Sequence, residues 1–341
     1  MVAGHPAEGD MTATVALFNN KGGVGKTTLA YHLAHMISRL GRRVLAVDLD
    51  PQANLTAHFL ADDELEGLWE GDEATNDTVA GAVHPIVEGL GDFRPILPRP
   101  VAENLFLLPG DLGLSRFEER LAQEWPATLA GGNNAAARVT TAFHRLVRDA
   151  SERTGAELVL VDVGPNLGAL NRAALLLADH VLVPLGADLF SAQGLRNLGP
   201  ALRRWRSDWQ DTALPRVAAT IDAPQGRMNP LGYVVMQPSM RLDRPVKAYQ
   251  LWLERIPSVY ATAVLGTAVG TAGDHEIGTV RNFRSLMPLA HDARKPMFDL
   301  RAADGAIGST QRYVQTCLTE FRALSRDVLD RVDTAALTPG G

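Results

Sequence analysis

The sequence of 341 residues predicts an α/β fold, in which a doubly wound, mostly parallel sheet carries helices on both faces. Two observations predict it. Short apolar runs alternate with segments of helical periodicity, the order that βαβ units require. Three polar motifs each follow an apolar run directly, and such sheets bind ligands at the carboxyl ends of their strands. We expect one domain over residues 12–332, with short tails at 1–11 and 333–341, because open α/β sheets reach this size as a single unit.

The first polar motif lies between a strand and a helix. Thr14–Phe18 is a short apolar run typical of a buried strand, and residues 29–40 place apolar side chains at helical spacing before Gly41. The stretch KGGVGKTT, residues 21–28, separates the two. Its glycines let several N–H groups face one phosphate, and the following helix adds about half a positive charge. This context predicts a phosphate loop, and a glycine-rich turn without a ligand explains fewer of these features.

The predicted loop assigns a role to each polar side chain. Lys26 is expected to bridge the β- and γ-phosphates of ATP, and the Thr27 hydroxyl to bind Mg²⁺. Thr28 is expected to line the phosphate nearest the base. The nucleotide-binding residues of the loop are therefore Gly22, Gly23, Val24, Gly25, Lys26, Thr27 and Thr28.

Two acidic motifs follow later strands. DLDPQAN, residues 48–54, comes after the predicted strand Arg43–Val47, and DVGPN, residues 162–166, comes after Leu158–Val161. In phosphoryl transfer a protein positions the nucleophile and neutralises charge. We therefore expect Asp50 to orient the attacking water, and Asp48 and Asp162 to hold Mg²⁺. Capping of the next helix is the structural alternative for Asp48 and Asp50.

The three motifs together resemble those of the ParA/MinD family of ATPases, closest to its ParA branch, over most of residues 12–330. KGGVGKTT resembles the deviant Walker A loop of that family, whose mark is an additional lysine, here Lys21. The resemblance implies a nucleotide-sandwich homodimer, in which Lys21 reaches the nucleotide of the partner and acts like an arginine finger in trans. It also implies that Gln237 and Pro288 line the adenine pocket. Gly164 and Asn166 depart from the Pro and Ser of the family, which predicts a looser switch.

The rest of the chain continues the alternation. Residues 60–99 are mixed and acidic, and are expected to form short helices and loops on the surface. The other expected elements are a strand at 105–108, helices at 115–125 and 135–153, a strand at 181–185, a helix at 190–209, a last strand at 231–237, a helical insertion within 246–275 and a final helix at 309–332.

The composition argues against several classes of protein. A single cysteine, Cys317, forms no internal disulfide, suits a reducing cytoplasm and argues against iron–sulfur relatives. No run approaches 18 apolar residues and the start lacks the pattern of a secretory signal, so a cytoplasmic protein is expected. Residues 1–11 are too short for a helix-turn-helix domain. His32 and His35 lie three apart without a third ligand nearby, so a solvated helix face is favoured over a metal site.

A net charge of −6 requires any contact with nucleic acid to come from a local patch. The densest basic cluster comprises Arg196, Arg203, Arg204 and Arg206. Such clusters are commonly solvated helix faces. The resemblance implies non-specific DNA binding in this half of the fold, with release triggered by a ParB-like or other activating protein. The final helix has its apolar residues at core spacing and is less basic than a membrane-targeting helix, so packing on the sheet is expected and no membrane binding.

The expected function is that of an ATP-dependent dimeric switch, which hydrolyses ATP to partition DNA or position a cargo. The residues alone support ATP binding and hydrolysis, and the rest follows from the resemblance. A ParA-like regulatory ATPase that acts only on a protein, and a MinD-like ATPase of the membrane surface, are the alternatives. No motif indicates a small-molecule substrate.

Overall fold

The computed structural model describes residues 12–70, 75–237, 246–267, 275–283 and 285–337. They form an eight-stranded sheet of order β3-β4-β2-β5-β1-β6-β7-β8, in which β3 pairs antiparallel with β4 and the other neighbours are parallel. The predicted fold class is confirmed. The strands are β1 Ala13–Leu17, β2 Val44–Leu49, β3 Arg99–Ala102, β4 Leu105–Leu108, β5 Leu158–Val163, β6 His180–Leu185, β7 Asn229–Met236 and β8 Glu276–Val280.

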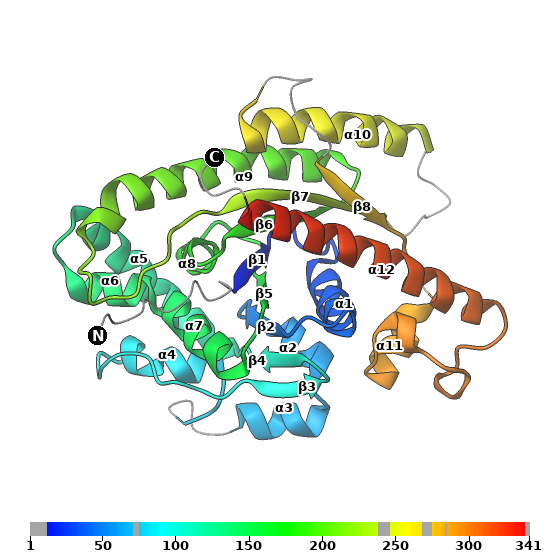
Figure 1. The fold of residues 1–341 in the computed structure, drawn as a ribbon, viewed down its shortest axis with the longest axis horizontal. Coiled ribbons are helices and arrows are strands. Elements are labelled where there is room, and N and C mark those ends of the chain that lie inside the picture. Colours follow the sequence, from blue (N-terminus) through cyan, green and yellow to red (C-terminus); the bar gives the residue numbers. More distant parts are fainter. Residues whose placement is uncertain (1–11, 71–74, 238–245, 268–274, 284, 338–341) are drawn as a thin grey trace, which may run out of the picture.

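Helices cover both faces of the sheet (Figure 1). One hydrophobic core joins the sheet to α4, α5, α7, α8 and α9, and the other joins it to α1, α11 and α12. The helices are α1 Lys26–Arg39, α2 Asn54–Phe59, α3 Asp62–Trp69, α4 Val79–Val87, α5 Ser115–Ala130, α6 Asn134–Thr140, α7 Ala142–Thr154, α8 Ala169–Leu176, α9 Leu189–Ser207, α10 Val246–Val259, α11 Leu286–Ala293 and α12 Ser309–Ala336.

Several boundaries differ from the sequence-based expectation. The strand at 231–237 is not the last one, because β8 pairs parallel with β7. Its sequence EIGTV is short and contains a glycine and a charge, which hide the strand pattern. The expected helix at 135–153 is two helices that meet at Thr141. Helix α12 continues to Ala336, beyond the expected end.

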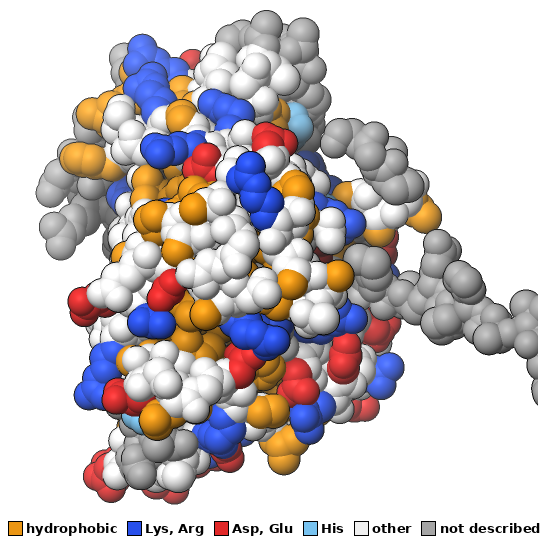
Figure 2. All heavy atoms as spheres, turned by 90° about the vertical axis from the view of Figure 1, so that its left-hand side faces the viewer, with side chains coloured by type: hydrophobic (Ala, Val, Ile, Leu, Met, Phe, Trp, Pro, Cys, Tyr) orange, Lys and Arg blue, Asp and Glu red, His pale blue; other side chains and the backbone are white. Residues whose placement is uncertain are grey.

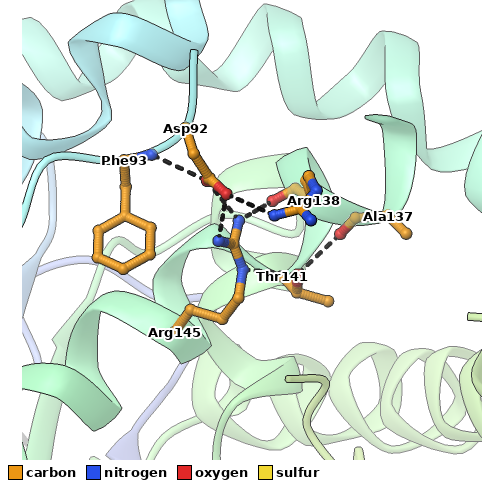
Figure 3. A network of polar contacts seen from close by, with 6 residues as sticks. All are labelled: Asp92, Phe93, Ala137, Arg138, Thr141 and Arg145. Carbon is orange, nitrogen blue, oxygen red and sulfur yellow. Dashed lines mark hydrogen bonds and ion pairs between the residues drawn. The ribbon is translucent and has the colours of Figure 1, made fainter. Parts of the chain in front are cut away.

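The acidic stretch at 60–99 is partly internal. Helix α4 buries five apolar side chains in the core, so the expectation of a surface segment is wrong for this helix. The chain after α4 is fixed by Asp92, which Arg145 of α7 binds through two hydrogen bonds of 2.7 Å (Figure 3). Arg138 of α6 adds a bond of 2.9 Å, and the Arg145 guanidinium lies over the Phe93 ring. Burial raises the pKa of Asp92, but the bonds from both arginines and the Phe93 N–H leave it below its ordinary value.

The strand order brings the three polar motifs to one edge. Strand β5 lies between β1 and β2, so the residues that follow these strands meet. Asp48 and Asp162 are direct partners across β2 and β5, and Leu17 is opposite Asp162 on the other side. Within the described residues, no helix is both long and apolar enough to cross a membrane.

Candidate functional site

The glycine-rich loop connects β1 to α1. Gly23 and Gly25 have φ of 70° and 85°, a left-handed conformation that L side chains rarely adopt. Nothing lies within 4 Å of a Cβ placed on Gly23, so its backbone conformation, and not the space around it, requires glycine there. Asn19 fixes the start of the loop, because its amide donates to the Pro184 carbonyl at 2.7 Å while its Oδ1 accepts from the Lys21 N–H at 3.0 Å.

The glycine-rich loop and strand β5 meet at Asp162. The Thr27 hydroxyl donates to Asp162 Oδ2 at 2.6 Å, and Lys26 Nζ lies 3.6 Å from Oδ1. Asp162 is fully buried, and its Oδ1 accepts no hydrogen bond from any described residue. Burial raises the pKa of this carboxyl, while Lys26 and the Thr27 bond oppose that change. An acceptor oxygen that is buried and unsatisfied beside a threonine hydroxyl fits a divalent cation such as Mg²⁺.

Asp48 is engaged on the other side of the site. Its Oδ2 accepts from the Thr56 N–H at 2.8 Å and from the Thr56 hydroxyl at 2.7 Å, which ties β2 to α2. Thr56 Oγ1 in turn accepts from the Gly110 N–H at 2.8 Å. Burial, with the nearby Asp162 charge, raises the pKa of Asp48 to about 7 against the bonds from Thr56. The carboxylate expected to hold Mg²⁺ therefore already anchors a helix.

Asp50 lies at the end of β2 and is buried. Its Oδ1 accepts from the Gln52 N–H at 3.0 Å, a local turn contact. The same oxygen is 3.5 Å from where a Cβ on Gly164 would stand. The first and second acidic motifs therefore face each other at the site.

Lys21 is bound within its own chain. Its Nζ lies 2.5 Å from Oδ2 of Asp188, which caps α9 through the Ser191 N–H, and it lies over the Phe190 ring. Burial raises the pKa of Asp188, but the bonds from Lys21 and Ser191 leave it below its ordinary value. The side chains of Lys21 and Asp188 keep 29% and 26% of their surface exposed, so solvent can reach the pair.

The two residues expected to line the adenine pocket occupy separate elements. Gln237 is exposed just after β7, and its N–H donates to the Val280 carbonyl at 2.9 Å. Pro288 is exposed on α11. Neither lines the cavity of about 230 Å³ that reaches Thr28 between α1, α2 and α11. Met236 is the β7 residue against the loop, with its Cε 3.1 Å from the Cβ position of Gly25.

Sequence reasoning missed two residues that hold the second acidic motif. Asn171 of α8 binds Gly164 and Asn166 through its side-chain amide. Glu118 of α5 accepts from the N–H groups of Ala169 and Leu170, each at 2.6 Å. Asn171 is close enough in sequence to be suspected as a cap, whereas nothing in the local pattern around Glu118 points to α8. These bonds argue against the looser switch that was predicted.

The four arginines expected to bind DNA are not equivalent. Arg203 donates to the carbonyls of Ala263 and Val264 at 2.7 and 2.9 Å, and Arg206 donates to the Met228 carbonyl at 2.7 Å. Arg196 is exposed, and the Arg204 side chain keeps 82% of its surface exposed, 3.6 Å from Asp208. Figure 2 shows acidic side chains among the basic ones on the left-hand face of Figure 1.

His32 on α1 is buried and His35 is partly buried, so the expectation of a solvated face is wrong. His32 donates through Nδ1 to the Thr28 carbonyl at 2.7 Å, and its Nε2 accepts from the Met297 N–H at 3.0 Å. The second bond makes Nε2 the unprotonated nitrogen, so Nδ1 carries the hydrogen. Among the described residues, no group of three or more His, Cys, Asp or Glu is placed to hold a metal.

Known proteins share this sequence pattern. The model of a family described as an AAA domain matches residues 12–212, more than half of the chain. The chain is 32% identical over 204 residues to the chromosome-partitioning ATPase Soj of Thermus thermophilus. The matching stretch covers 57% of this chain and 62% of that protein. It is also 32% identical over 214 residues to a probable plasmid-partitioning protein ParA of the same organism, a stretch that covers 61% of this chain and 56% of that protein. The chain thus spans less than two thirds of the length of each relative.

The fold is also shared. Protein DIP2308 from Corynebacterium diphtheriae superposes with a TM-score of 0.69 at 23% identity, over 95% of this chain and 99% of that one. This likeness shows the fold, whereas the family model extends over the loop and both acidic motifs. The chain belongs to the AAA-domain family of P-loop ATPases, and within it to the ParA branch of the ParA/MinD family.

Proposed function

We propose that this protein is a Mg²⁺-dependent ATPase that works as a dimeric switch in partitioning DNA or positioning a cargo. The observation that carries the proposal is the cluster of Lys26, Thr27 and Asp162 at the end of β5. A P-loop lysine, a hydroxyl and a buried carboxylate side by side form the set that positions a nucleotide triphosphate and its metal. A cytoplasmic location and a single domain over residues 12–332 are part of the proposal.

ATP would bind with its phosphates on the loop. The N–H groups from Gly22 to Thr28 and the start of α1 offer positive charge, and Lys26 offers an ammonium group. Thr27 and Asp162 would hold Mg²⁺, which supplies charge neutralisation at the phosphates when bound. Asp48 would act behind them, since its bonds to Thr56 hold α2 against the site.

Asp50 is proposed to orient the water that attacks the γ-phosphate. It is buried at the end of β2, faces the second motif at Gly164, and its Oδ1 binds only its own turn among the described residues. A carboxylate held in this way can accept a hydrogen bond from water without losing contacts elsewhere. Gln237, which follows β7, and Pro288 of α11 are proposed to bind the adenine.

We propose that Lys21 acts on the nucleotide of a partner subunit. For this it must exchange the Asp188 carboxylate for phosphate, which its half-exposed position permits. Exposed apolar side chains near Lys21 and just after the second acidic motif support an interface at this edge: Phe190 is 72% exposed, Leu189 52% and Leu167 37%.

DNA binding in the ATP state is proposed to rest on Arg196 and Arg204, because Arg203 and Arg206 already bind carbonyls. One monomer would contact few phosphates and bind weakly, whereas a dimer would present two such patches as one unit. A ParB-like or other activating protein would then trigger hydrolysis and release.

The test measures ATP turnover and the anisotropy of a labelled duplex at several salt concentrations. Binding is expected with ATP and Mg²⁺ and should fade with ADP. Arg196→Ala with Arg204→Ala should weaken it and flatten the salt slope by about one per lost phosphate contact. Arg322→Ala with Arg326→Ala, exposed on α12, removes the same charge elsewhere and should leave it unchanged.

The second candidate is a ParA-like ATPase that acts only on a protein partner. It is favoured by the net charge of −6 and by the carbonyl bonds that engage two of the four arginines. Turnover without DNA binding in the ATP state would select this candidate. Absence of ATP turnover, alone and with activating proteins, would refute both.

A further inference from the structure

The side chain of Asn171 is buried at the first turn of α8, with 1% of its surface exposed. Its Oδ1 accepts from the Gly164 N–H at 3.1 Å. Its Nδ2 donates to the Gly164 carbonyl at 2.9 Å, to the Asn166 carbonyl at 2.8 Å and to Asn166 Oδ1 at 3.0 Å. One amide thus binds both backbone groups of Gly164 and closes the loop between β5 and α8.

The contact requires an N–H at position 164 and leaves little room for a side chain there. A Cβ on Gly164 would stand 3.3 Å from Asn171 Nδ2 and 3.4 Å from Oδ1, closer than most carbon contacts. Gly164 lies outside the left-handed backbone region, so its φ does not demand glycine. The N–H donor and the close approach of the amide therefore favour glycine opposite Asn171 in this chain.

The C-terminal end of the same loop is also held by side-chain hydrogen bonds, from Asn166 and from Glu118 of α5. Asn166 Oδ1 accepts from the Gly168 N–H at 2.8 Å, and Glu118 caps α8 at Ala169 and Leu170. A Cβ on Gly168 would stand 2.4 Å from Glu118 Oε1, so a side chain there would displace the Glu118 carboxylate. The loop is thus fixed at both ends, and the amide of Asn171 lies inside it.

We propose that Asn171 is a positioning residue of the ATPase site, which sets the loop 164–168 between Asp162 and α8. This inference rests on the proposed function. Gly164 follows Asp162 by two residues, and its Cβ position lies 3.5 Å from Asp50 Oδ1. The amide therefore places the backbone that faces the water-orienting carboxylate. Asn171 touches neither Asp50 nor Asp162 through any hydrogen bond between described side chains, so its effect passes through the loop.

Asn171→Ala should lower kcat for ATP by about tenfold or more, because the amide contacts with Gly164 and Asn166 are lost. Affinity for ADP, measured by calorimetry, should change by less than about threefold, since the phosphate loop is untouched. Hydrogen exchange at Gly164 and Gly168 should speed up by about tenfold. Asn133→Ala is the control, because it removes an amide that caps α6, and kcat should stay as in the parent.

Gly164→Pro separates positioning from a general loss of stability. Proline needs no acceptor and fixes φ, and the preceding strand residue suits it. Alone, it leaves Asn171 Oδ1 without its donor and crowds the amide, so kcat should fall. When Gly164→Pro is combined with Asn171→Ala, the crowding is relieved and kcat should rise again, so the double variant should be faster than Gly164→Pro alone.

These outcomes decide the proposal. A folded Asn171→Ala variant with parental kcat and exchange would overturn it, as would a double variant no faster than Gly164→Pro. The second comparison stands even if Asn171→Ala does not fold alone. A parent protein without turnover would refute the proposed function instead, and the exchange of Gly164 would then decide whether Asn171 holds the loop.

Discussion

Acid should destabilise this protein through His32, although the residue lies outside the predicted site. The ring is fully buried on α1, stacks on Phe321 with centroids 4.9 Å apart, and has both nitrogens engaged. Protonation of Nε2 would place an N–H against the N–H of Met297, so that bond becomes a repulsion. Burial, with the nearby His58, lowers the pKa of His32 to about 4 against the Thr28 bond.

The sign and the size of this loss of stability follow from the linkage between protonation and folding. The unfolded chain protonates this histidine near its ordinary pKa of 6.5 and the folded protein near 4, so the unfolded state binds more protons between these values. The contribution is therefore complete above pH 6.5 and is lost as the pH falls toward 4. At about 1.4 kcal/mol per pKa unit, about 2 kcal/mol of the free energy of unfolding should be lost by about pH 5.

The measurement is chemical denaturation of the parent and of His32→Gln at about pH 7.5 and about pH 5. The variant lacks the titrating group, so the stability gap between the two proteins should narrow by about 2 kcal/mol in acid. His35, whose pKa burial lowers to about 3, titrates in both proteins and cancels in the difference. His291→Gln, at an exposed position on α11, is the control. The difference in stability between this variant and the parent should be the same at both pH values. A gap for His32→Gln that does not depend on pH would refute the buried, neutral ring.

Three further predictions concern the nucleotide. Lys26→Ala should weaken ATP binding by about 10- to 100-fold in calorimetry, because a charge-assisted contact is lost, and parental affinity would refute the phosphate loop. Lys21→Ala should keep ATP binding in the monomer but lose the ATP dimer or slow turnover by about 10³-fold, so a normal dimer with normal turnover in light scattering and kinetics would exclude the trans role. Asp50→Ala should slow turnover by about 100-fold or more while ATP binding and dimerisation persist; unchanged turnover would assign the water to another residue, with the Asn166 region first.

The fold class and the loop could be predicted because their signals are local. Residues 21–28 and their flanking strand and helix lie within one stretch of chain, and each residue there has a backbone or charge requirement. The general rule that such motifs meet at the carboxyl edge of a parallel sheet predicts that they lie near one another, and the observed strand order β2-β5-β1 places Asp162 beside Thr27. Strand β8 was missed because its glycine and its charged residue interrupt the apolar pattern.

The remaining contacts join residues far apart in sequence, and periodicity gives no information about them. The apolar spacing of α1 shows one buried face, but only the packing of α12 and the Met297 segment shows that His32 belongs to it. In the same way, Lys21 has a motif that predicts its role, whereas its partner Asp188 is 167 residues away and carries no motif of its own. A resemblance transfers the residues that relatives share, so it predicts which residues should contact the nucleotide. It is least informative where the chain departs from the pattern, and at Gly164 the structure supplies what the pattern lacks: the N–H that glycine retains and proline would lose is the group that Asn171 binds.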